Sequence, residues 1–121
     1  MNTQREIPIF SPVAKVQFVP DAVLKGFKSY AESVQWAWEN RNHSGMAEAD
    51  DQALCARLIG LHAPHMSRCV NPNSKAPMNL SPDLLPAFEA FTGWRAPSQY
   101  IASKAQMTVL EQLIEEKRIA A

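Results

Sequence analysis

Residues 52–71 read QALCARLIGLHAPHMSRCVN, and this stretch decides the fold. Its residue types predict two short helices packed across a tight turn. The helices would cross at the fifth residue, which must be small, and Ala56 stands there. The ninth residue lies in the turn, where the backbone tends toward positive φ, and Gly60 stands there. The positions that face the opposite helix are all apolar: Cys55, Ile59, Leu61, Met66 and Cys69.

This pattern is typical of a helix-turn-helix, with helices expected over about 50–59 and 63–70. Before it, apolar residues recur at helical spacing from residue 21 to about residue 40, which predicts a helix with Asp21 as its N-cap. Trp36 lies off the apolar stripe, and we expect it to cover a neighbouring helix rather than to mark a contact surface. The stripe consists of Val23, Phe27, Tyr30, Ala31, Val34 and Trp38.

The segment after the motif predicts two further helices. Ser81, followed by a proline, is a strong N-cap signal for a helix that ends near Thr92, with Gly93 at its C-cap. Ser98 is expected to cap a last helix that runs to about Arg118.

The expected fold class is therefore all-α, with about five helices. Residues 1–20 contain three prolines, and residues 13–19 have some strand character. We expect this segment to be an N-terminal extended arm that packs on the body or on a partner. Residues 21–121 are expected to form one helix-turn-helix DNA-binding domain with a C-terminal helix.

The motif resembles the helix-turn-helix of the lambda-repressor and Cro family of phage regulators. Gln52, Ala56, Gly60, Leu61 and Asn71 all match the pattern of that family. The later sequence FTGWRAPSQYIA is similar to a segment of small prophage and plasmid regulators of the CII type. The resemblance implies a sequence-specific, DNA-binding transcriptional repressor or activator rather than an enzyme.

The resemblance also implies that residues 63–70 form the recognition helix in the major groove of double-stranded DNA. Arg68 would bond two acceptors of a guanine, and Gln52 would clamp a phosphate at the N-terminus of the first helix. Ala63 and Pro64 depart from the family, because many relatives carry hydrogen-bonding side chains there. The candidate DNA-binding residues are Gln52, His62, Ala63, Pro64, His65, Ser67, Arg68, Asn71, Asn73 and Lys75.

Charge and hydropathy agree with this interpretation. The net charge is zero, yet residues 52–82 carry Arg57, Arg68 and Lys75 and no acidic residue. An acid-free window in a balanced chain is a modest footprint for phosphates. No stretch is apolar enough to span a membrane, and no signal peptide is recognisable, so we expect a cytoplasmic protein.

Several alternatives remain open at this point. Cys55, His62, His65 and Cys69 form a conceivable zinc set, but their spacing fits no familiar finger, so we expect neither metal nor cofactor. An apolar stripe on the last helix, with Met107, Leu110, Leu113 and Ile114, is typical of a core and also suits a homodimer interface. The rival function is a protein-interaction module of the same fold, such as an antitoxin or an inhibitor directed at a host or regulatory protein.

Overall fold

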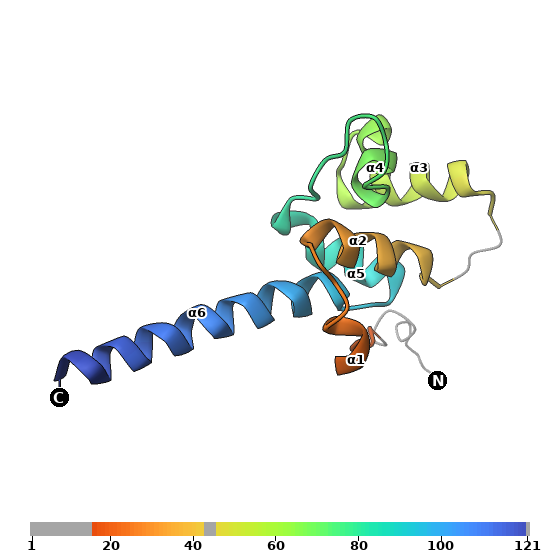
Figure 1. Cartoon of the computed structure of the whole chain (residues 1–121). Coiled ribbons are helices and arrows are strands. Elements are labelled where there is room, and N and C mark those ends of the chain that lie inside the picture. The colour runs from red at the N-terminus through yellow and green to blue at the C-terminus, as the bar shows by residue number, and fades with distance from the viewer. Residues whose placement is uncertain (1–15, 43–45, 121) are drawn as a thin grey trace, which may run out of the picture.

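The computed structural model describes residues 16–42 and 46–120 of the chain. Over these residues the fold is all-α, as predicted, with six α-helices, a short 3₁₀ turn and no strand longer than a single bridge (Figure 1). The elements are α1 (Asp21–Leu24), α2 (Tyr30–Glu39), α3 (Glu48–Ile59), α4 (Ala63–Val70), η2 (Pro82–Leu84), α5 (Leu85–Thr92) and α6 (Ala96–Ala120).

The prediction of one helix over residues 21–40 is wrong, because the chain breaks after Leu24 and restarts at Tyr30. Asp21 is the first residue of the short α1 and not its cap. The cap of the longer helix is Ser29, which is in an extended conformation and whose hydroxyl accepts a hydrogen bond from the backbone N–H of Glu32. The helical stripe continues across the break, so the periodicity alone did not reveal it.

The core lies where α2, α3, α4, α5 and the first turn of α6 meet. Val34 and Trp38 of α2 are buried there, and the ring of Trp38 stacks on Phe91 with centroids 6.0 Å apart. Trp36 does cover a neighbouring element, since its ring meets Trp94 edge to face at 4.9 Å. The aromatic residues of α2 therefore bind the α5–α6 corner to the rest of the body.

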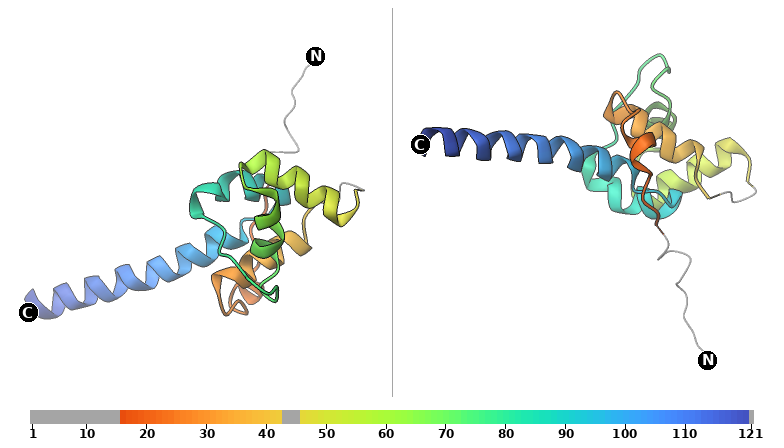
Figure 2. Two further views of the ribbon diagram at one scale, coloured as in Figure 1. Left: turned by 90° about the horizontal axis from the view of Figure 1, so that it is seen from above. Right: turned by 60° about the horizontal axis from the view of Figure 1, so that its bottom comes forward.

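Helix α6 begins at Ala96, two residues before the predicted cap Ser98. The fully buried carboxylate of Glu89 on α5 accepts the backbone N–H of Ser98 at 2.8 Å and pairs with Arg95 at 3.2 Å. This carboxylate does at the start of α6 what a capping side chain would do. The helix then runs away from the body in every view (Figures 1 and 2).

The N-terminal segment is described only from residue 16, so most of the expected arm lies outside the described residues. Gln17 forms a parallel bridge with Trp94, and Val19 is buried. The backbone of Val19 is held at both its N–H and its carbonyl by the amide of Gln99 on α6, at 2.7 and 3.1 Å. The described end of the arm thus packs on the body. No described helix has the length and apolar character needed to cross a membrane.

Candidate nucleic-acid interface

The α3–α4 unit has the geometry that its sequence pattern predicted. Gly60 ends α3 with φ of 85°, and the backbone N–H groups of Gly60 and Leu61 both donate to the carbonyl of Ala56, at 3.0 and 2.8 Å. Of the inward positions, Cys55, Ile59, Met66 and Cys69 are buried and Leu61 is half-buried, while Ala56 is completely buried at the crossing. The bihelical prediction over residues 52–71 is confirmed.

The first turn of α4 faces solvent. His62 occupies the N-cap position, and His62, Ala63 and Pro64 are exposed. The ring of His65 is half-buried and meets the ring of His62 edge to face, with centroids 4.9 Å apart. Ser67, one turn further along, is exposed. The outward end of α4 therefore presents two imidazoles and one hydroxyl, with no acidic residue on this helix.

Arg68 is not the exposed residue that the sequence suggested. Its side chain is half-buried and its Nε donates a hydrogen bond to the carbonyl of Ala76, eight residues further along. The backbone carbonyl of Arg68 also accepts the N–H of Met78, at 3.2 Å. Arg68 thus fastens the loop that follows α4 to the last turn of that helix. The predicted base contact of Arg68 stays a prediction, and its side chain is less exposed than expected because the local helical pattern cannot show where this loop returns.

The loop over residues 71–79 has a defined shape of its own. The side-chain carbonyl of Asn71 accepts the backbone N–H of Asn73 at 3.0 Å, and its backbone carbonyl accepts the N–H of Ser74 at the same distance. These two overlapping turns, both beginning at Asn71, set the direction of the chain at the end of α4. The side chains of Asn71, Asn73 and Lys75 are exposed. The predicted phosphate-contacting residues of this loop are accordingly on the surface beside α4.

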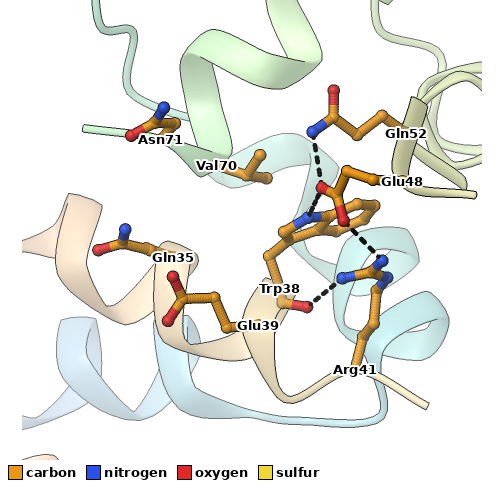
Figure 3. Close-up of a pocket in the computed structure, with 8 residues that line it drawn as sticks. All are labelled: Gln35, Trp38, Glu39, Arg41, Glu48, Gln52, Val70 and Asn71. Atoms are coloured by element: carbon orange, nitrogen blue, oxygen red, sulfur yellow. Dashed lines mark hydrogen bonds and ion pairs between the residues drawn. The ribbon is translucent and has the colours of Figure 1, made fainter. Parts of the chain in front are cut away.

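Gln52 lies elsewhere, in a polar network between α2 and α3 (Figure 3). Its amide donates to Glu48 at 2.8 Å, and the same carboxylate accepts the indole N–H of Trp38 at 2.8 Å. The guanidinium of Arg41 lies 4.0 Å above the Trp38 ring and pairs with Glu48 at 3.0 Å and with the buried carboxylate of Asp51. Gln52, Glu48, Trp38 and Arg41 line a hollow of about 550 Å³ that extends to Asn71.

The electrostatics of this hollow do not suit a phosphate. The pKa of Glu48 is lowered, chiefly by the indole hydrogen bond of Trp38, so the carboxylate stays ionised. Burial alone would lower the pKa of Arg41, but its hydrogen bonds to Asp51 and Glu48 raise it, so its charge is already neutralised within the protein. The hollow therefore carries no spare positive charge.

The expectation that Gln52 opens the first helix of the motif is wrong. Helix α3 begins at Glu48, which places Gln52 in its second turn, and the first turn carries the acidic Glu48, Asp50 and Asp51. The helix N-terminus is consequently occupied by carboxylates, which repel a phosphate. Sequence periodicity located this helix correctly but gave its start two residues too late.

The two cysteines are buried and their thiols are free. Burial raises the pKa of Cys55 to about 12 and also raises that of Cys69, so both thiols are neutral at physiological pH. His62 is exposed, whereas both sulfurs are buried. Within residues 16–42 and 46–120, no three His, Cys, Asp or Glu side chains come together in a way that could hold a metal ion.

Sequence reasoning missed the polar groups that hold the scaffold. Glu89, Arg41 and Asp51 gave no sequence signal, because each pairs with a residue that only folding brings close. The hydroxyl of Tyr30 donates to the carbonyl of Leu80 at 2.8 Å, fixing the end of the loop after α4. Tyr30 was predicted as core, and its burial raises its pKa to about 12.

Comparison of the chain with protein-family models, with curated proteins and with solved structures finds no match.

Proposed function

We propose that this chain is a transcriptional regulator that binds double-stranded DNA with α4 in the major groove. The observation that carries the proposal is the α3–α4 unit: its inward positions are packed, Gly60 in its turn has the positive φ that favours glycine, and the exposed face of α4 carries no acidic residue. A face that is not needed for packing and carries hydrogen-bonding groups is what groove recognition requires.

In this proposal the exposed groups divide into two sets. His62 at the N-cap of α4 and Ser67 on the helix can exchange hydrogen bonds with base edges, and Ala63 can contact a thymine methyl. Lys75 and Asn73 on the following loop lie within the acid-free window and are suited to phosphates. Gln52 is left out of the interface, because its amide is directed to Glu48. Few side chains thus read bases directly, and DNA shape contributes to site choice.

The test begins with selection of a binding site from random double-stranded DNA of about 30 base pairs, long enough for two half-sites one turn apart. Fluorescence anisotropy then gives the Kd for the selected duplex and for a scrambled duplex of equal composition. We expect the selected duplex to bind more than about 1,000-fold more tightly than the scrambled one. The logarithm of the affinity should fall linearly with the logarithm of the salt concentration.

Lack of enrichment in the selection, or equal affinity for the two duplexes, would overturn the proposal. The rival function, a protein-interaction module such as an antitoxin or a host-directed inhibitor, would then be favoured. A specific observation supports that rival: Leu58 on α3 is 61% exposed, within the same motif. Replacing Leu58 by Ser separates the two functions, because DNA binding should tolerate the change and an apolar protein contact should not.

A further inference from the structure

The outer part of α6 is a helix face without a partner among the described residues. Residues 110–120 are all exposed, and the C-terminal part of the helix extends away from the body (Figures 1 and 2). Leu110 is 53% exposed, Leu113 is 54% exposed and Ile114 is 63% exposed. Two shallow apolar hollows meet at Leu110 along this face. The expectation that the stripe forms part of the core is therefore wrong for these three residues.

A helix segment in this position needs a cover. Most helical stability in proteins comes from packing of an apolar face against another element. The segment also exposes several large aliphatic side chains in one row, which is characteristic of an interaction surface. Its spacing of three and four residues suits a second helix laid along it.

The charges on this segment indicate which helix that is. Glu111 and Arg118 lie seven residues apart, on one flank of the apolar row, and Leu113 lies on the opposite flank. If a second copy of α6 packs in the opposite direction, Leu110 of each copy meets Ile114 of the other. The register then places Glu111 against Arg118 of the other copy, twice by symmetry, and brings the two Leu113 side chains together near the two-fold axis.

A parallel arrangement lacks this complementarity. With the two helices in register and parallel, Leu113 of one copy would face Arg118 of the other, and Glu111 would face Gln106. An apolar side chain would then be set against a charge, and no ion pair would form.

We propose that two copies of this chain associate through an antiparallel α6 pair with reciprocal Glu111–Arg118 contacts. The antiparallel pair would also supply the second subunit of the proposed DNA complex. Only this last point rests on the proposed function.

The first test measures oligomeric mass without DNA. Sedimentation equilibrium of the full chain should give twice the 13.5 kDa chain mass. The single variants Glu111→Arg and Arg118→Glu each turn two attractive contacts into repulsive ones and should weaken dimerisation by about tenfold. The double variant restores the opposite charges in exchanged positions and should recover most of the wild-type dimer affinity. Arg118 also pairs with Glu115 on its own helix. Arg118→Glu removes this pair in both the single and the double variant, so its loss cannot account for the recovery.

The second test uses oxidative cross-linking of introduced cysteines, since the two native thiols are buried. Leu113→Cys should cross-link two copies efficiently, whereas Leu110→Cys should not, because Leu110 faces Ile114 of the other copy. Cross-linking of Leu110→Cys alone indicates a parallel pair and overturns the proposal. So does a monomeric wild-type chain, or a double variant as weak as the two single ones. A dimer with these properties that binds no DNA would retain this inference and remove the proposed function.

Discussion

Arg68 gives the sharpest test of how the proposed interface works. Its side chain donates to the carbonyl of Ala76, so Arg68→Ala should loosen the loop that carries Asn73 and Lys75, while the backbone bond from Met78 to residue 68 remains. If Arg68 acts by positioning this loop, the variant loses the phosphate contact of Lys75 without losing any base contact. If Arg68 instead reads a guanine, the variant loses sequence preference at one base pair.

The two outcomes differ in measurable quantities. A hydrogen bond from a charged group contributes about 1.5–3 kcal/mol, and partial exposure of Arg68 places the stability loss near the lower end, at about 1.5 kcal/mol. Loss of one phosphate contact reduces the slope of log affinity against log salt by about 1. Loss of a bidentate base contact would cost about 1–3 kcal/mol at a single base pair and leave the other positions unchanged.

The assay is fluorescence anisotropy with the selected duplex and its single-base-pair variants, across a series of salt concentrations. Four proteins are compared: the wild type, Arg68→Ala, Lys75→Ala and the double variant. We expect the two single variants to reduce the salt slope by about the same amount, and the double variant to reduce it little further. Relaxed preference at one G·C pair in Arg68→Ala, together with a strictly additive double variant, would refute the positioning role.

Three further predictions concern the scaffold. Gly60→Val should lower the free energy of unfolding by about 2 kcal/mol and the melting temperature by roughly 8 °C. The reason is backbone strain, since φ of 85° disfavours a β-branched residue although nothing lies within 4 Å of the added Cβ. Gly26→Ala, at a glycine without positive φ, is the control, and an equal shift in both variants would contradict the argument. The free energy of unfolding should fall as the pH rises from about 9 to about 12. Burial raises the pKa of Cys55 and of Tyr30, so the unfolded chain loses these protons at lower pH than the folded chain does. A constant midpoint of urea unfolding over that pH range would count against the burial of these two side chains. Cys55 and Cys69 should resist a thiol-labelling reagent in the native protein and react fully in denaturant, as measured by mass spectrometry. Rapid labelling of the native protein would contradict the packed contact between α3 and α4.

The sequence by itself determined the local conformation of the central unit. Gly60, Ala56 and the apolar inward residues specify the α3–α4 turn through contacts between near neighbours in the chain. Ser81 and Gly93 likewise fixed the two ends of the η2–α5 segment, with Ser81 accepting from Asp83 and Gly93 at φ of 88°. Signals of this kind depend on a few adjacent residues, so they can be recognised without knowing the fold.

The tertiary structure decided which side chains remain available for a partner. Arg68 pairs with a loop that returns to it, and Gln52 turns toward Glu48 at the start of α3. The same long-range packing buries Glu89 and leaves the outer face of α6 uncovered. A side chain's partner depends on segments that folding brings together, and helical periodicity carries no information about them. The sequence alone could therefore locate the two helices α3 and α4 and their turn, whereas only the folded chain showed that Arg68 and Gln52 bond to other residues of the same chain.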